Sequence, residues 1–344
     1  MFAPLFHAWE RRLAAVSKDR VVRPFEWGLD WIGSGQPAGE DAEVRLGDYV
    51  RRALADSDGF FTPAPTASYG LDASSNGEGA TLTFETSLPT PHPHNNTVYA
   101  RYFPGRLRDG ARARRAVVLL PQWNADAGGH IGLSRLLARV GVSALRLSLP
   151  YHDRRMPPEL ARADYIVSAN VARTLEVCRQ AVHDARRAVW WLRDRGYDRI
   201  GILGTSLGSC LAMLTAAHEP LIRAQALNHI SPYFADVVWH GLSTRHVREG
   251  LDGRIDLERL RALWMPISPI QHLDRIRDRR TLLVYAKYDL TFPVDLSRSL
   301  VAEFRKRGIP HRLAVLPCGH YSTGTVPFKF LDGYVLTSFL HRHL

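Results

Sequence analysis

Short apolar runs alternate with longer amphipathic segments along most of this chain. Between residues 80 and 103, apolar and polar positions alternate with a period of two, which predicts half-buried strands that pair as a hairpin. After residue 115 the apolar runs are continuous, as expected of strands that are covered on both faces. Strands are therefore predicted at Ala80–Glu85, Thr97–Phe103, Ala116–Leu120, Ser143–Leu149, Arg199–Leu203, Arg223–Leu227, Thr281–Ala286 and His311–Leu316.

The segments between these strands carry apolar residues at helical spacing. They predict helices at Gly132–Val140, Ala169–Arg195, Leu207–Ala217, Leu296–Arg307 and Pro327–His343. Strands that alternate with helices are typical of the α/β class, in which helices flank both faces of a mostly parallel central sheet. We expect this arrangement over residues 80–344.

Two segments depart from the alternation. Residues 1–79 show no repeat of strand and helix, although Leu5–Val16 has the pattern of an amphipathic helix. We expect this N-terminal extension to pack on the core. The second segment, about residues 233–279, mixes aromatic and charged residues and contains no apolar strand. It fits a helical cap inserted above the sheet, where a cap shapes the substrate pocket.

One short motif carries a specific chemistry. Gly204-Thr205-Ser206-Leu207-Gly208 follows a predicted strand and precedes a predicted helix. This is the context of the G-x-S-x-G nucleophile elbow, a tight turn that holds a serine hydroxyl at the edge of the sheet. Glycine is needed on both sides of the serine because strand and helix nearly touch there. Ser206 is therefore the candidate nucleophile.

A serine nucleophile needs a histidine base and an acid that orients the base. Asp289 and His320 each follow a predicted strand near the end of the chain, and the acid precedes the histidine, which is the order that accompanies an elbow serine. Asp295 is the rival acid. It falls where the next helix begins, so its charge is better explained by the helix dipole.

The tetrahedral intermediate of such a reaction needs N–H donors in an oxyanion hole. The Leu207 N–H opens the elbow helix, and a second donor is expected from the loop after Ala116–Leu120. In that loop Trp123 is the first choice and Gln122 the second. Further polar residues follow predicted strands and are candidates for substrate binding, although surface-loop roles also fit them: Asn124, Tyr151, His152 and His229.

Composition removes several classes of function. The net charge is +11, but the 45 basic residues are interspersed with 34 acidic ones and form no long basic run, so no nucleic-acid partner is expected. Three cysteines do not make a disulfide framework. There is no leader pattern and no apolar run long enough to span a membrane. We expect a cytoplasmic protein with a small-molecule ester substrate, no cofactor and no metal site.

The elbow, the strand-end Asp289 and His320, and the segments 149–159 and 229–234 together resemble the α/β-hydrolase superfamily over residues 80–344. Within it they are similar to a poorly characterised branch of abhydrolase-domain proteins. The resemblance implies a serine hydrolase that cleaves a carboxylic ester through an acyl-enzyme intermediate. The same triad also serves peptidases, amidases and acyltransferases, and a hydrolase scaffold can carry a non-catalytic binding protein. The acyl group, the leaving group and the oligomeric state are left open.

Overall fold

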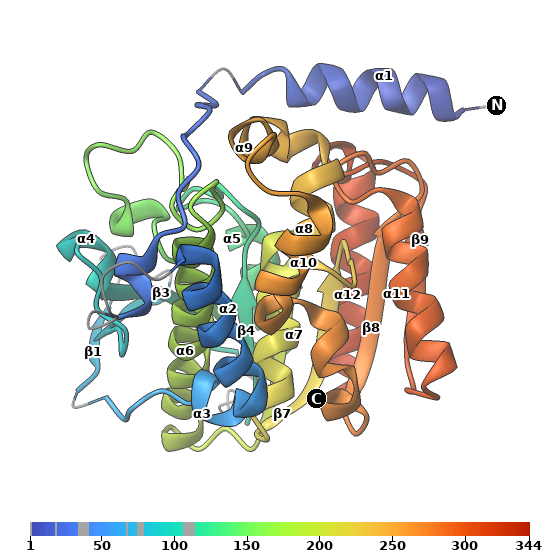
Figure 1. Ribbon diagram of the computed structural model, residues 1–344. Coiled ribbons are helices and arrows are strands. Elements are labelled where there is room, and N and C mark those ends of the chain that lie inside the picture. The colour runs from blue at the N-terminus through green and yellow to red at the C-terminus, as the bar shows by residue number, and fades with distance from the viewer. Residues whose placement is uncertain (1, 18, 34–40, 67, 74–78, 106–113) are drawn as a thin grey trace.

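A nine-stranded sheet forms the centre of the described part of the chain (Figure 1). The computed structural model describes residues 2–17, 19–33, 41–66, 68–73, 79–105 and 114–344. Along the sheet the strand order is β1-β2-β3-β5-β4-β6-β7-β8-β9. The strands are β1 (Gly70–Ala73), β2 (Ala80–Glu85), β3 (Thr97–Phe103), β4 (Arg115–Leu120), β5 (Ser143–Leu147), β6 (Arg199–Thr205), β7 (Ile222–Asn228), β8 (Arg280–Ala286) and β9 (Arg312–Leu316).

The sheet is parallel where the apolar runs are continuous and antiparallel where they alternate. Strands β5, β4, β6, β7, β8 and β9 pair in parallel. The predicted hairpin is confirmed, because β2 and β3 pair antiparallel with Phe84 opposite Val98. Before the hairpin, β1 pairs with β2, so the sheet begins within the segment that was expected to be only an extension.

Helices cover both faces of the sheet, and each face has its own apolar core. In β4, Val118 packs into one core, whereas its neighbours Val117 and Leu119 pack into the other. The first core lies under α6 (Val171–Asp194), α7 (Leu207–His218) and α11 (Val294–Lys306), and the second under α5 (Ile131–Arg139) and α12 (Phe328–His343). This two-sided burial explains why these strands lack polar alternation.

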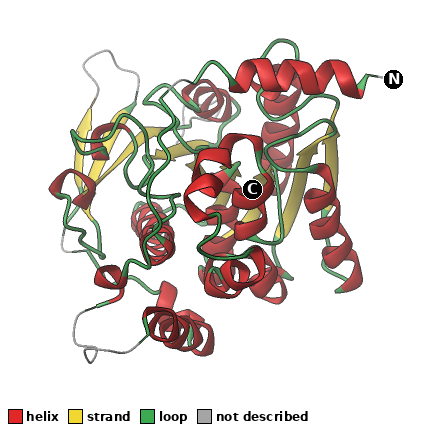
Figure 2. Cartoon of the chain, turned by 45° about the horizontal axis from the view of Figure 1, so that its top comes forward, coloured by secondary structure: helices red, strands yellow, loops and turns green. Residues whose placement is uncertain are grey.

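The predicted cap is helical. It contains α8 (Phe234–His240), α9 (Arg245–Leu251) and α10 (Leu257–Leu263), with one 3-10 segment between α8 and α9 and two more after α10. Figure 2 shows the helices of the chain packed around the central strands. The insertion between β7 and β8 therefore adds walls to the site without adding a strand.

The N-terminal segment contains more helix than its sequence suggested. The expected helix is α1 (Ala3–Ala14), which lies across the end of the molecule above α8 and α9 (Figure 1). The helices α2 (Ala42–Ala55) and α3 (Ser57–Phe61) are not expected from the sequence pattern. An aspartate, Asp41, does stand just before α2, and aspartate is a preferred N-cap residue. In the structure its carboxylate accepts from Glu43 N at 2.7 Å and caps α2.

Candidate active site

Ser206 lies on a strained turn between β6 and α7. Its backbone φ of 57° and ψ of −121° lie in a region that residues other than glycine rarely adopt. The flanking glycines are required by contact: a Cβ on Gly204 would lie 1.9 Å from Gly208 O, and a Cβ on Gly208 would lie 2.1 Å from Leu120 O. The turn therefore has the conformation expected of a nucleophile elbow.

Four neighbouring parallel strands each place one polar residue at the same edge of the sheet. Ser206 follows β6, His229 follows β7, Asp289 lies beyond the end of β8, and His320 lies beyond the end of β9. The carboxyl ends of parallel strands share one edge, so residues far apart in sequence converge there. Asp295, the rival acid, is instead exposed on α11 and pairs with Arg298 at 3.5 Å.

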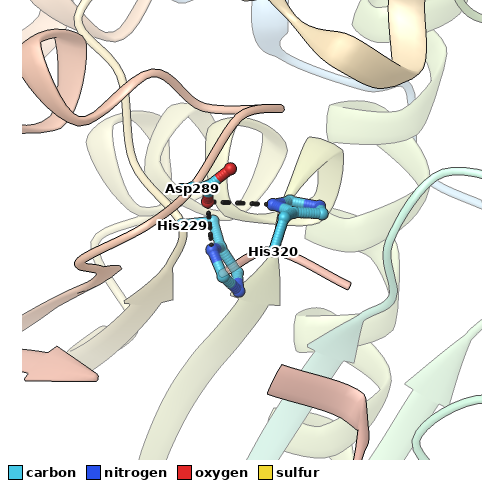
Figure 3. Close-up of side chains that lie close together, drawn as sticks. All are labelled: His229, Asp289 and His320. Atoms are coloured by element: carbon cyan, nitrogen blue, oxygen red, sulfur yellow. Dashed lines mark hydrogen bonds and ion pairs between the residues drawn. The ribbon is translucent and has the colours of Figure 1, made fainter. Parts of the chain in front are cut away.

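Asp289 is the most heavily hydrogen-bonded carboxylate at this edge (Figure 3). Its Oδ2 accepts from His320 Nδ1 at 3.1 Å and from His229 Nδ1 at 2.8 Å. Its Oδ1 accepts from the N–H groups of Thr291 at 2.8 Å and Phe292 at 2.7 Å. Burial alone raises the pKa of the Asp289 carboxyl, but the charges and hydrogen bonds of the two histidines outweigh burial and hold that pKa well below its usual range.

The second histidine on Asp289 is the main surprise of the site. From the sequence, His229 is expected only to bind substrate. In the structure its ring is buried and its Nδ1 donates to the carboxylate that also orients His320. A signal did exist in the sequence, because His229 follows a predicted strand in the same way that Asp289 and His320 do.

The loop that carries His320 is held by the N-terminal helix. Glu10 of α1 is fully buried, and its carboxylate accepts from Tyr321 N at 2.8 Å and Ser322 N at 2.9 Å. Gly319 leaves room for this contact, since a Cβ there would lie 2.3 Å from Glu10 Cδ. The role of Glu10 could not be expected from the sequence, because Glu10 and residues 319–322 lie more than 300 positions apart.

Two cavities meet at Ser206. The first, called here the apolar cavity, is narrow, at about 50 Å³. It lies between the core and the cap and is lined mainly by Trp123, Leu207, Met213, Leu227, Ile230, Phe234, Val237, Val238, Phe292 and Leu300.

The second cavity, called here the polar chamber, has a volume of about 520 Å³. Ser206, Trp123 and Ser243 line both cavities. The other polar residues of the chamber include Arg20, Gln122, Asn124, His130, Arg162, Thr205, Asn228, His229, His320, Tyr321, Lys329 and Asp332. Ser206 and His320 thus face the same space, although no hydrogen bond joins them among the described residues.

The expected oxyanion donors make no hydrogen bonds within the described chain. Within the described chain, the backbone N–H groups of Gln122, Trp123 and Leu207 have no hydrogen-bond acceptor. The next N–H in the loop, that of Asn124, is already bonded to His152 Nε2 at 2.9 Å. Trp123 is fixed by a hydrogen bond from Nε1 to Ala163 O at 2.8 Å. These contacts leave the N–H groups of all three candidates available to an oxyanion.

The cluster His229, Asp289 and His320 also has the composition of a metal site. One ligand atom from each residue lies within 4.8 Å of the other two. Both Nδ1 atoms, however, point at the same carboxylate oxygen at hydrogen-bond distance. A cation would have to displace both hydrogen bonds, so the cluster is better suited to holding protons on the two rings.

Comparisons with known proteins agree with this architecture. No protein-family model and no curated protein matches the sequence. Solved structures do match: an acetyl xylan esterase from Paenibacillus sp. R4 has a TM-score of 0.59 and 15% identity over 90% of this chain and 97% of its own. Acetyl xylan esterase 1 from Thermoanaerobacterium sp. JW/SL YS485 has a TM-score of 0.57 and 15% identity over 92% and 99%.

A third match is the Pyrococcus horikoshii acylaminoacyl peptidase, with a TM-score of 0.58 and 14% identity over 80% of this chain. The present chain spans only 49% of that peptidase. The chain has the α/β-hydrolase fold. The fold predicted from strand and helix order is thereby confirmed. Sequence identities of 14–15% do not show that this chain shares the activity of these proteins.

Within the α/β-hydrolase fold, two of the expected substrate-binding residues take supporting positions. Tyr151 and His152 are buried and line neither the apolar cavity nor the polar chamber. The Tyr151 hydroxyl bonds to His92 Nδ1 at 3.0 Å, and His152 Nδ1 bonds to Pro150 O at 2.8 Å. Both residues follow a predicted strand and lie at the same edge of the sheet as Ser206, but packing turns both side chains into the protein. Asn124 and His229 do line the polar chamber.

The three cysteines are free, and one of them lines the apolar cavity. All three cysteines are buried and unbonded to one another. None of the helices in the described ranges combines the length and the apolar character needed to cross a bilayer. Cys210 lines the apolar cavity, and burial raises the pKa of its thiol well above the usual range. Cys210 is therefore a packing residue in this wall.

Proposed function

We propose that this protein is a serine hydrolase that cleaves a carboxylic ester through an acyl-enzyme intermediate. One observation carries the proposal: Ser206 projects from a strained elbow into the chamber that His320 also lines, and His320 is hydrogen-bonded to a buried Asp289. Esterases and a peptidase are among the proteins that share the fold, which supports hydrolysis as the class of reaction.

In this proposal Asp289 orients His320 from the Nδ1 side. Its carboxylate accepts the Nδ1–H, so the lone pair of His320 is on Nε2 and can take the proton from Ser206 as its oxygen attacks the ester carbonyl. The Leu207 N–H and the Trp123 or Gln122 N–H stabilise the oxyanion. His320 then gives the proton to the leaving alcohol, and water repeats the sequence to release the acid.

The apolar cavity favours a short acyl group. It has about 50 Å³ of free space and mainly hydrophobic walls, whereas a single water needs at least roughly 10–15 Å³ on the same measure. An acyl chain of a few carbons fits such a space, and a long fatty acyl chain requires the cap to move. We expect activity to fall as the acyl chain lengthens.

The rival reactions use the same residues. A peptidase or amidase differs in the leaving group, and an acyltransferase replaces water by an acceptor alcohol. No contact among the described residues favours one of these over ester hydrolysis. They are distinguished by the products that form when an ester, an anilide and an ester plus excess alcohol are compared under the same conditions.

The proposal is tested by labelling and by kinetics. A fluorophosphonate should label the wild type on Ser206 and leave Ser206→Ala unlabelled. On para-nitrophenyl esters, Ser206→Ala should lose about 10⁴-fold or more in kcat, and Asp289→Asn about 10⁴-fold because His320 takes the wrong tautomer. Asp295→Asn is the matched control and should keep its activity. Full activity of Ser206→Ala would refute the proposal.

A further inference from the structure

The proposed reaction assigns the two halves of the ester to the two cavities. The general acid that protonates the leaving oxygen must reach it, so the alcohol leaves from the side of His320. That side is the polar chamber, because His320 lines the chamber and does not line the apolar cavity. This inference rests on the proposed function: the acyl group occupies the apolar cavity, and the alcohol half occupies the polar chamber.

The charges that line the chamber are unequally paired. Arg162 already faces two carboxylates, Asp19 at 3.0 Å and Asp164 at 3.7 Å. Asp332 accepts two contacts from the amide of Asn228, at 3.1 and 3.0 Å. Burial raises the pKa of Asp332 to about 6, while the charge of His229 and the Asn228 hydrogen bond act in the opposite direction.

Two cations of the chamber have no acidic partner. Among the described residues, neither Arg20 nor Lys329 has a carboxylate within ion-pair distance, although Asp332 is one helical turn from Lys329. A guanidinium without a counter-charge, partly removed from water, is costly unless a ligand supplies one. In the described chain, the charged side chains that line the chamber are Arg20, Arg162 and Lys329 against the single carboxylate of Asp332, so cationic groups outnumber anionic groups in its wall.

Arg20 is held beside the general acid. Its Nη2 donates to the Tyr321 hydroxyl at 3.1 Å, and Tyr321 directly follows His320 in the chain. The Arg20 Nε is buried without a hydrogen-bond partner in the described structure, whereas Nη1 has no partner there and is not buried. The guanidinium therefore retains an N–H group on Nη1 that a ligand in the chamber can reach.

We infer that the polar chamber recognises an anionic group on the alcohol half of the ester, with Arg20 as its main contact and Lys329 as a second. The group is an oxyanion such as a carboxylate, phosphate or sulfate, because a guanidinium presents parallel N–H donors that match two oxygens of such a group. The substrate class is thus a short-chain ester of a hydroxylated anion.

Three matched esters test this inference. They share a butanoyl group and differ only in the alcohol: para-hydroxybenzamide, para-hydroxybenzoate and para-hydroxyphenyl phosphate. Wild type should prefer the two anionic esters in kcat/KM by about tenfold, mainly through KM, which is the effect of one charge-assisted hydrogen bond. The ratio between the carboxylate and phosphate esters identifies the favoured anion. Added salt should reduce the preference for both.

Substitution of Arg20 locates the effect. Arg20→Gln keeps a polar side chain without the charge and should remove most of the roughly tenfold preference, measured as the ratio of kcat/KM between the anionic esters and the neutral ester. The matched control is Arg12→Gln, an exposed arginine of the same N-terminal segment that lines neither cavity. It should keep the full preference.

Binding without turnover separates this inference from the proposed function. Calorimetry with Ser206→Ala should detect para-hydroxybenzoate and not para-hydroxybenzamide, and the double variant with Arg20→Gln should lose the signal. If the esters are cleaved without any anionic preference, the inference is overturned and the hydrolase stands. If no ester is cleaved but the anion binds through Arg20, the anion site stands and the proposed reaction is wrong.

Discussion

Asp289 Oδ2 carries two imidazole donors, and this sharing has a chemical consequence. A carboxylate held by a second donor is less free to turn away from the first. The Nδ1–H of His229, at 2.8 Å from Oδ2, therefore helps to fix the carboxylate that orients His320 in the proposed mechanism. We expect His229 to be a positioning residue that acts through Asp289.

Replacing His229 tests this role. In His229→Leu the donor is lost, and we expect kcat to fall by about tenfold with little change in KM, which is the effect of one hydrogen bond to a charged group. His229→Asn keeps an N–H donor near the carboxylate and should restore part of kcat. Asp295→Asn is the control and should keep the wild-type kcat. A raised KM with an unchanged kcat would mean that His229 contacts the substrate and does not act through Asp289.

Helix α1 holds the loop that carries His320, the proposed base, although α1 lies far from β9 in the sequence. Glu10 satisfies two N–H groups directly after His320, and Phe6 stacks on Tyr288, the neighbour of Asp289, at 4.4 Å between ring centroids. Helix α1 therefore contacts both the loop that carries Asp289 and the loop that carries His320. The β8 and β9 ends converge because the strands are parallel, but their loops take their final shape from α1.

Glu10→Ala should both destabilise the protein and impair catalysis. Two buried N–H groups lose their acceptor, which costs about 2–3 kcal/mol in the free energy of unfolding, and His320 loses part of its support. The measurements are urea unfolding and kcat on a short ester at a temperature where the variant is fully folded. Arg12→Ala, on the exposed side of α1, is the control. Unchanged kcat in folded Glu10→Ala would show that α1 only covers the site.

At the scale of the whole molecule, buried histidines make stability depend on pH. Burial, the largest cause, lowers the pKa of six histidines to about 3 or 4. One of them, His130, lines the polar chamber, and the other five are almost inaccessible to solvent: His152, His183, His218, His246 and His272. These residues stay neutral in the folded chain, whereas in the unfolded chain they bind protons below a pKa of about 6.5.

The sign of the effect follows from which state binds more protons. As the pH falls below about 6.5, the unfolded chain takes up protons that the folded chain refuses, so stability decreases. Between pH 7.5 and 5.5 the loss should be about 1 kcal/mol for each histidine, which together is a large part of a typical folding free energy. Urea unfolding at both pH values measures it.

A single substitution checks the origin of this pH effect. His272 bonds to Pro266 O through Nε2 at 2.8 Å, and His272→Gln can keep a donor there while it removes the titrating ring. The decrease in stability between the two pH values should shrink by about 1 kcal/mol. An equal decrease in wild type and variant would assign the effect to other groups.

Local sequence patterns were sufficient for eight of the nine strands, for the helices that flank them and for the elbow, whereas β1 was not predicted. Continuous apolar runs require burial on both faces, and the two glycines around Ser206 reflect contacts within one turn. The placement of Asp289 and His320 at one edge also followed from strand order, because parallel strands end on the same side. All of these properties depend on neighbours in the chain or on the period of the pattern.

Contacts between distant residues were decided only by the tertiary structure. The hydrogen bond from Ser322 N to Glu10 spans 312 positions, and the bond from His229 to Asp289 spans 60. Strand order brings His229, Tyr151 and His152 to the same edge, but side-chain packing turns His229 toward Asp289 and the other two into the protein. Packing depends on the shapes of all neighbouring side chains at once, and a linear pattern does not contain that information.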